Sequence, residues 1–459
     1  MILQNRQFQC CVALTIVQQL ALAASTYLIA LAGGSLAAND VSRTRYLIVL
    51  FFGFALGAYL IGSLVTYLTT RLKNSLWRNY VLETLETLKF DQTRSSRVDQ
   101  QRTIGWLGGE AFSTLEQAGE FAVGTVGIYC NVVLTFAAFA LTLGAGITAA
   151  LASAVLVSLA LTRALRHRIR RLARESQSSR LDALVDIGAL WDRFLFADSR
   201  IAARARKRFV GHAARYFAKI ERCVVTEQLI ACLPIYVAIP LALAVMVRSD
   251  TTDPVTMGMI VAVLPRSLQL LGSIHELSVS NSKVFFFVEK LRNLAGFVAT
   301  LEVQALEQQI RWAAIRVTDL STGLALDAHA FYRSVSAPGI ARGRFRLTGA
   351  NGCGKTSLLK LIKQARPEAL YCAQDVRLVD DVERASTGQR QVRQLEILLS
   401  AALPTTLLLD EWDANLDAAN AARVDRMLEA RSSALLIVEV RHLSAADATG
   451  ISRELLASP

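Results

Sequence analysis

The sequence predicts a multidomain protein, with an all-α domain of six transmembrane helices followed by an α/β domain that contains a phosphate-binding loop. Three observations predict this organisation. Six long apolar runs occur before residue 298, the mean hydropathy of +0.36 is high for a soluble protein, and the glycine-rich segment TGANGCGKTS follows at 348–357. We therefore expect a membrane domain at 1–297 and a reduced nucleotide-binding domain at 298–459.

The apolar runs predict six membrane spans. They lie at about 11–33, 46–69, 121–143, 146–164, 224–247 and 258–280. Each run is close to the ~20 residues that cross a hydrocarbon core of ~30 Å as a helix. The alternative is a large buried helical core in a soluble protein. We disfavour it because runs of this length seldom repeat six times in soluble folds.

The chain has a net charge of +12, and the distribution of its basic residues indicates the topology of these spans. Arginine and lysine are concentrated in 71–120 and 165–223, whereas the loops 34–45 and 248–257 contain few of them. By the positive-inside rule, the basic segments and both termini face the cytoplasm. We therefore expect a multi-pass protein of the inner (plasma) membrane, with the nucleotide-binding domain in the cytoplasm. The basic segments beside the membrane account for the basic pI. The lipid bilayer is therefore an expected partner, and nucleic acid is not.

The two basic segments predict long cytoplasmic hairpins. Both lack clusters of glycine and proline and keep apolar residues at helical spacing, so we expect helices that extend out of the membrane. Their tips fall near 89–96 and 190–200. The second tip is unusually apolar, which indicates either packing within the hairpin or docking onto a partner domain. We favour docking, and the residues concerned are Trp191, Phe194, Leu195 and Phe196.

The segment 343–365 has the pattern G-x-x-x-x-G-K-[ST] between a strand and an amphipathic helix. Gly349, Gly352 and Gly354 let the backbone curl, so that its N–H groups converge on phosphate oxygens. The N-terminus of the following helix adds its positive dipole end. Lys355 would reach the β- and γ-phosphates of ATP, and Thr356 would supply a hydroxyl to Mg²⁺. The other candidate nucleotide-binding residues of this loop are Asn351, Cys353 and Ser357.

A second motif, TTLLLDEWDANLD at 405–417, predicts a buried strand that ends in two acids. Asp410 at the carboxyl end of the strand would hold Mg²⁺, directly or through water. Glu411 would act as the general base that activates the attacking water.

Together these motifs resemble the ATPase domain of ABC transporters. The order GANGCGKT, AQD, STGQRQ, LLLDE, ANLD and then His442 is similar to that family. Six spans before one such domain resemble the half-transporter exporters, whose fold is a domain-swapped helical bundle joined to a RecA-like ATPase. The resemblance covers essentially the whole chain, through architecture before residue 298 and through motifs after it.

The resemblance implies roles for further residues. Ser386, Gly388 and Gln389 match the family's signature segment, which clamps the γ-phosphate of ATP bound to the opposite subunit. Gln374 corresponds to the glutamine that senses Mg²⁺ and touches the membrane domain. His442 would contact the γ-phosphate, although a single histidine after a strand is more often structural.

The sequence also departs from the family pattern. Ala385 and Thr387 differ from the usual signature residues. The intervals from Lys355 to Gln374 and from Gln374 to Ser386 are much shorter than in the family, so the β- and helical subdomains are largely missing. No aromatic residue is well placed to stack on adenine, since Phe331 and Tyr332 match poorly. The segment DEW in place of DEP resembles exporters of cyclic peptides and siderophores.

The resemblance implies ATP-driven export of a peptide or other amphipathic molecule by a homodimer or heterodimer with a second half-transporter subunit. An alternative is a nucleotide-binding regulatory subunit, or a catalytically weak one, of a heterodimeric transporter. A third interpretation is a membrane-anchored enzyme such as a kinase. The position of STGQRQ before the acidic strand disfavours it.

Charged residues within the spans give an indication of cargo. Arg266 lies inside the sixth span and should face a wet cavity or a partner, unless it extends to the outer interface. Gln269, His275, Glu276 and Glu227 could line the same pathway. We expect a cavity suited to a polar or anionic amphipathic cargo such as a peptide.

Overall fold

The computed structural model describes residues 5–142, 144–248, 254–337, 342–373, 376, 378, 387–400 and 405–441. The chain divides into two compact units. The first comprises Met1–Thr84 and Ile104–Ala299, and the second comprises Leu85–Thr103 and Thr300–Pro459. The segment 85–103, which the sequence analysis includes in 1–297, is thus grouped with the C-terminal unit.

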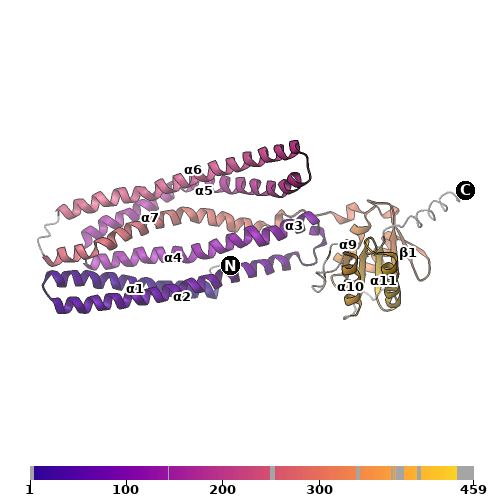
Figure 1. Ribbon diagram of the computed structural model, residues 1–459, viewed down its shortest axis with the longest axis horizontal. Coiled ribbons are helices and arrows are strands. Elements are labelled where there is room, and N and C mark those ends of the chain that lie inside the picture. The colour runs from indigo at the N-terminus through magenta and orange to yellow at the C-terminus, as the bar shows by residue number, and fades with distance from the viewer. Residues whose placement is uncertain are drawn as a thin grey trace. The chain divides into compact units, whose positions relative to one another are not determined.

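Long helices make up the membrane half of the chain (Figure 1). In order they are α1 (Arg6–Ala37), α2 (Val41–Leu88), α3 (Arg97–Gly105), α4 (Ala111–Thr142), α5 (Ala145–Leu195), α6 (Ser199–Arg248) and α7 (Pro254–Gly296). Among the described residues, six helical segments are long and apolar enough to cross a membrane, and each contains one of the predicted runs. The prediction of six spans is therefore confirmed at the level of helix length and composition.

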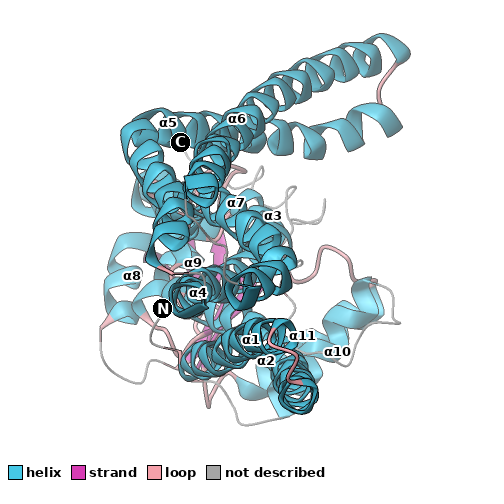
Figure 2. Cartoon of the chain, turned by 90° about the vertical axis from the view of Figure 1, so that its left-hand side faces the viewer, coloured by secondary structure: helices cyan, strands magenta, loops and turns pink. Residues whose placement is uncertain are grey.

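The helix ends locate the two predicted hairpin tips. The helix α2 ends at Leu88 and α3 begins at Arg97, so the first turn lies at 89–96. The helix α5 ends at Leu195 and α6 begins at Ser199. Figure 2 shows α5 and α6 as a pair of helices joined by a short loop. Both turns fall where the sequence predicts them.

A crossing of small residues joins α1 to α7. A Cβ atom added at Gly258 would lie 2.6 Å from the carbonyl oxygen of Gly33. A Cβ atom added at Gly33 would lie 2.5 Å from the carbonyl oxygen of Gly258 and from the Cβ of Ala262. Close backbone approach through small residues is a common way for helices to associate in lipid, where the hydrophobic effect does not drive helices together.

Hydrogen bonds between side chains connect α4 to α7. The Thr125 and Ser280 hydroxyls are 2.8 Å apart, and the Asn131 amide donates to the Ser273 hydroxyl over 2.9 Å. Arg266 donates to the amide oxygen of Asn131 over 3.0 Å. These pairs satisfy polar groups that the bilayer core would leave without water. The guanidinium of Arg266 is thus bonded to partner side chains on α4.

The second unit contains a mixed sheet of β1 (Arg316–Asp319), β2 (Ala325–Asp327), β3 (Gly343–Thr348), β4 (Leu370–Ala373), β5 (Thr406–Asp410) and β6 (Leu436–Val440). Among the described residues its strand order is β2-β1-β3-β6-β5-β4. The strands β3, β6, β5 and β4 are parallel neighbours, whereas β1 is antiparallel to both β2 and β3. The predicted strands at 343–348 and 406–410 are central in this sheet.

Helices cover both faces of the sheet, and the alternation of residues along β6 shows why. Val438 packs in the cluster that includes residues of α8 (Ala328–Ser336) and α9 (Lys355–Ala365). Ile437 packs in the opposite cluster, with residues of α10 (Thr387–Ser400) and α11 (Ala418–Arg431). Successive strand residues point to opposite faces, so a strand buried on both faces needs apolar residues at nearly every position.

The first hairpin turn belongs structurally to the second unit. The amide of Gln304 donates to the carbonyl oxygen of Thr93 over 2.8 Å. The ammonium of Lys363 on α9 lies 4.9 Å from the ring centroid of Phe90, within cation–π range. Because α9 directly follows the glycine-rich loop, this turn contacts the helix that the loop begins.

We predict that Gly258→Ala destabilises the membrane unit by about 1–3 kcal/mol, because the new methyl group would overpack the α1–α7 crossing. The matched control is Gly53→Ala on α2, where nothing lies within 4 Å of an added Cβ. We expect this control to be neutral or slightly stabilising, since alanine favours helices by ~1 kcal/mol over glycine. Thermal unfolding of the purified protein in detergent measures both. Equal unfolding midpoints for the two variants would contradict the crossing.

Candidate functional site

The glycine-rich loop, residues 349–354, connects the carboxyl end of β3 to α9. Gly349, Gly352 and Gly354 all have positive φ, at 156°, 78° and 97°. Residues with a Cβ rarely adopt the latter two, because the left-handed region is sterically costly for them. A Cβ on Gly354 would also lie 2.5 Å from the carbonyl oxygen of Gln309. The loop is therefore shaped by glycine and packs closely against the backbone of residues 309–314.

The loop leaves the N-terminus of α9 open. Gly354 is the N-cap of α9 and provides no side-chain hydrogen bond. By contrast, α8 and α11 are capped by Asp327 and Asp417, whose carboxylates accept from first-turn amides. The first N–H groups of a helix have no partner within it, and they attract anions together with the helix dipole. An acidic cap on α9 would repel an anion, and glycine avoids this.

Lys355 lies across the loop. Its ammonium donates to the carbonyl oxygen of Gly349 over 2.8 Å and to that of Ala350 over 3.3 Å. The hydroxyl of Ser357 donates to the Gln309 side chain over 3.0 Å. The ammonium of Lys355 therefore lies against the loop, and its present partners are neutral carbonyls that an anion could replace.

A cluster of oxygen atoms lies beside α9, at the carboxyl end of β5. The hydroxyl of Thr356 lies 3.2 Å from one carboxylate oxygen of Asp410, and the hydroxyl of Tyr371 lies 2.8 Å from the other. Burial, reinforced by the neighbouring Asp410, raises the pKa of Tyr371. Tyr371 therefore stays protonated and donates its hydrogen bond. Carboxylate and hydroxyl oxygens are the ligands that Mg²⁺ prefers, so this cluster fits that ion.

Glu411 follows Asp410 in a left-handed backbone conformation, with φ of 48°. Its amide donates to the carbonyl oxygen of Val440 over 3.0 Å. A left-handed conformation in a residue other than glycine is strained by about 1–3 kcal/mol and persists where surrounding contacts enforce it. The next residue, Trp412, is fully buried and anchors the turn.

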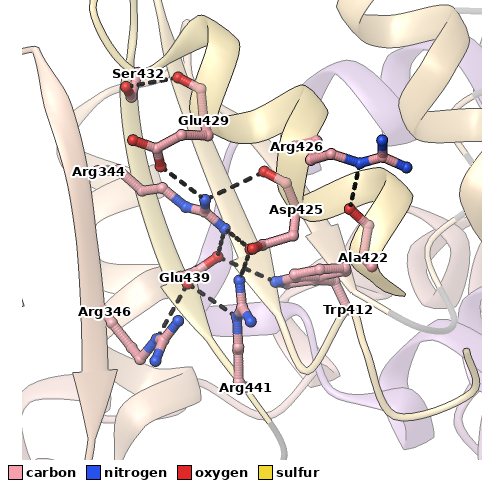
Figure 3. Close-up of polar contacts among 10 residues, drawn as sticks. All are labelled: Arg344, Arg346, Trp412, Ala422, Asp425, Arg426, Glu429, Ser432, Glu439 and Arg441. Carbon is pink, nitrogen blue, oxygen red and sulfur yellow. Dashed lines mark hydrogen bonds and ion pairs between the residues drawn. The ribbon is translucent and has the colours of Figure 1, made fainter. Parts of the chain in front are cut away.

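A buried charge network surrounds Trp412 (Figure 3). Its centre is Glu439 on β6, whose side chain is 0% exposed. Glu439 accepts hydrogen bonds from Arg344 over 2.9 Å, from Arg346 over 3.2 Å, from Arg441 over 3.0 Å and from the Trp412 indole over 3.3 Å. These donors come from β3, from the end of β5 and from the residue after β6. The network therefore ties together the strands that carry the candidate site.

Acidic residues on α11 balance the remaining charge. Arg344 bonds to Asp425 over 2.6 Å and to Glu429 over 3.2 Å, and Arg441 pairs with Asp425 as well. Burial by itself raises the pKa of Asp425, but hydrogen bonds from Arg344 and Arg441 lower it overall. Three arginines and three carboxylates thus neutralise one another, which a buried charge requires.

The structure places most of the predicted site residues at the carboxyl ends of β3 and β5. Gly388 and Gln389 lie on α10 instead. A Cβ on Gly388 would lie 2.4 Å from the carbonyl oxygen of Asn415, so packing inside the chain already requires glycine there. Three predicted residues lie outside the described part of the chain, namely Gln374, Ser386 and His442.

Sequence reasoning missed Tyr371 and the charge network. The signal for the network was present, because Arg344 and Glu439 are charges of opposite sign within two strands that are otherwise apolar inside. Phe331, considered above for adenine stacking, is instead a core residue, with its ring centroid 4.9 Å from that of Phe345. Trp312 lies next to Arg311, whose amide bonds to the carbonyl oxygen of Cys353 in the loop, and its ring packs against His329 and Tyr332.

We predict that Glu439→Ala lowers the free energy of unfolding by about 3 kcal/mol or more, because it leaves buried arginines without their shared partner. The control is Glu429→Ala, which removes a carboxylate that also pairs with Arg344 but is 63% exposed. This control should cost at most about 1 kcal/mol. Denaturant unfolding of the full chain in detergent compares them. Equal losses would show that burial does not set the strength of this network.

Comparison of the sequence with models of protein families and with curated proteins finds no match. The assignment of function therefore rests on the residues of the site and on the architecture around it.

Proposed function

We propose that this protein exports an amphipathic molecule across the inner membrane, driven by ATP hydrolysis, as a dimer with a second half-transporter subunit. The observation that carries the proposal is the glycine-rich loop with the uncapped N-terminus of α9, beside the oxygen cluster of Thr356 and Asp410. This combination fits a nucleoside triphosphate with its metal ion. It occurs in a chain with six helices of spanning length.

In this proposal the C-terminal unit is a RecA-like ATPase domain of the ABC type. Amides of the loop and of the first turn of α9 bind phosphate oxygens, and Lys355 exchanges its two carbonyl partners for them. Thr356 and Asp410 hold Mg²⁺, which when bound neutralises charge on the phosphates. Tyr371 keeps the second oxygen of Asp410 occupied, and so orients the carboxylate toward Thr356.

Glu411 is the general base of the proposed reaction. It lies directly after the metal-binding Asp410, and the bond from its amide to Val440 fixes its backbone. A base that is held rigidly beside the phosphates can position a water and accept its proton. Trp412 and the network around Glu439 keep this turn in place.

The hairpin turns would transmit the closure of the ATPase domains to the membrane helices. The contacts of Thr93 with Gln304 and of Phe90 with Lys363, all within the second unit, support this role for the first turn. At the second turn Trp191 is 68% exposed and Phe196 is 81% exposed. Apolar surface of this kind is expected where another protein surface covers it. We propose that the partner subunit's ATPase domain does so, and the cytoplasmic location of that domain follows from the basic segments.

The second candidate function is a regulatory or weakly hydrolysing subunit of a heterodimer. The short interval between β4, which ends at Ala373, and α10, which begins at Thr387, favours it. That interval leaves little room for a helical subdomain. A purified chain that hydrolyses ATP only together with a sister subunit would support this candidate.

We predict that Glu411→Gln lowers ATP turnover by ~10²–10⁴-fold, the contribution of a general base, while ATP binding is retained. Lys355→Ala is the binding control and should lose both. Phosphate release from the purified protein in lipid measures turnover, and filter binding of labelled ATP measures occupancy. Wild-type turnover in the Glu411→Gln variant would refute the assignment of the base.

We predict that Phe196→Asp uncouples the two halves of the protein, because a carboxylate cannot be buried in an apolar docking site without a partner. Cargo-stimulated ATPase activity should fall severalfold while basal activity stays near the wild-type level. The control is Val210→Asp on the same hairpin, which introduces the same charge at a residue 54% exposed but away from the turn. Equal stimulation of wild type and Phe196→Asp would exclude docking through this turn.

A further inference from the structure

Two adjoining cavities lie among α4, α5, α6 and α7 within the membrane unit. One has a volume of about 340 Å³ and the other about 610 Å³. Phe121 and Lys283 line both of them. We call the two together the charged cavity. Their volumes lie in the range of ~300–1,000 Å³ that is typical of sites for small molecules.

The charged cavity lies near one end of three predicted spans. It is lined by Phe121 at the start of the third span and by Glu227 near the start of the fifth. His275 and Lys283 line it around the end of the sixth span. In the topology proposed above, this end faces the cytoplasm. A molecule could therefore enter the cavity from the cytoplasm or from the inner leaflet.

Three of the charged side chains that line the cavity already have partners in the protein. Arg180 forms an ion pair with Glu110 at 2.9 Å. Lys290 donates to Gln117 over 2.8 Å. Glu120 pairs with Lys73 at 3.4 Å. Arg180 and Glu120 are therefore neutralised by ion pairs, and Lys290 has a hydrogen-bond partner in the protein.

Glu227 and Lys283 are different. One carboxylate oxygen of Glu227 is buried and has no hydrogen-bond partner in the described part of the chain. Lys283 forms neither a hydrogen bond nor an ion pair with any described residue, although it and His275 attract the charge of Glu227 across the cavity. A buried carboxylate oxygen without a donor costs free energy, and a ligand that supplies the donor regains it.

Aromatic rings form the apolar part of the cavity. The rings of Phe121 and Phe287 stack with their centroids 4.2 Å apart, and both line the larger cavity. Gly124 on α4 lines the smaller one, and an added Cβ there would meet nothing within 4 Å. The cavity thus combines an apolar wall with the partly buried carboxylate of Glu227 and the ammonium of Lys283. Glu276 also lines the smaller cavity without a partner among the described residues, but it is exposed.

We propose that the charged cavity binds a small zwitterionic amphiphile of the dipeptide type. Its ammonium group pairs with Glu227, its carboxylate pairs with Lys283, and its apolar side chains pack against Phe121 and Phe287. Such a ligand gives Glu227 and Lys283 a partner each without adding net charge to a site of low dielectric constant. The inference deepens the proposed function and rests on it only in that the ligand would be the cargo, since binding itself requires no nucleotide.

A binding assay tests the proposal on the full-length protein in nanodiscs of phosphatidylcholine, without nucleotide. The probe is tritiated leucyl-phenylalanine with free termini, compared with its N-acetylated form and its C-terminal amide. We expect the free dipeptide to bind wild-type protein about tenfold more tightly than either capped form, as the loss of a hydrogen bond to a charged group predicts. Wild-type protein that binds all three equally, or none of them, overturns the proposal.

Variants assign each end of the ligand. Lys283→Gln should weaken binding of the free dipeptide about tenfold and leave binding of the C-terminal amide unaffected. Glu227→Gln should also weaken binding of the free dipeptide about tenfold, and it should leave binding of the N-acetylated form unaffected. The matched control is Lys290→Gln, which lines the same cavity but has a protein partner, and should preserve the preference. If Lys290→Gln abolishes the preference for a free carboxylate and Lys283→Gln does not, the assignment of Lys283 is overturned.

Two further arms complete the test. Gly124→Leu should weaken all three dipeptides, because it fills the cavity without touching a charge. Nanodiscs containing phosphatidylethanolamine examine the other zwitterion available in a membrane, and displacement of the dipeptide by this lipid overturns the peptide assignment. ATP hydrolysis by wild-type protein and by Glu411→Gln is measured in the same discs. A normal difference between them without dipeptide binding would reject the cavity proposal and leave the proposed ATPase function standing.

Discussion

The requirement that polar groups removed from water find a partner determines the arrangement of both units of this protein. In the membrane unit it pairs α4 with α7, because hydroxyls, amides and the guanidinium of Arg266 on one helix find partners on the other. In the α/β unit it gathers four donors around the single carboxylate of Glu439. A shift of one residue in either arrangement would leave buried charges unpaired, so these contacts specify register as well as stability.

The network around Glu439 gives the candidate site its rigidity. Arg344 lies on the strand that leads into the glycine-rich loop, Trp412 directly follows Glu411, and Arg441 directly precedes the residue predicted to contact the γ-phosphate. One buried carboxylate therefore bonds to three chain segments, namely β3, the turn after β5 and the residue after β6. A buried ion pair is weak evidence of net stability. It disfavours alternative geometries in which a buried charge would be left without a partner. This explains how Glu411 is kept in a strained backbone conformation.

Features that depend on local sequence were predictable, and features that depend on distant pairing were not. The spans follow from the length of apolar runs, and the shape of the loop follows from the positions of Gly352 and Gly354. The bond between Arg344 and Glu439 joins residues 95 positions apart. This bond depends on β3 and β6 being neighbours in the sheet, which no local sequence pattern predicts. For the same reason the sequence placed 85–103 with the membrane half, whereas its contacts with Gln304 and Lys363 group it with the α/β unit.

The same requirement distinguishes polar groups that have a partner in the protein from polar groups for which we propose a ligand. The helices α8 and α11 begin with an aspartate that satisfies their first amides, whereas α9, of similar length, begins with glycine and leaves those amides available. Both kinds of cap are common, and only the glycine permits an anion to approach. In the membrane unit, Arg180 and Lys290 have protein partners while Glu227 retains an oxygen without one. Other buried polar atoms also lack a partner among the described residues, for example Arg266 Nε and Ser282 Oγ, but the Glu227 oxygen lies on a cavity with room for a ligand. The uncapped N-terminus of α9 and the buried oxygen of Glu227 are therefore the groups whose hydrogen bonds the proposed ligands would complete.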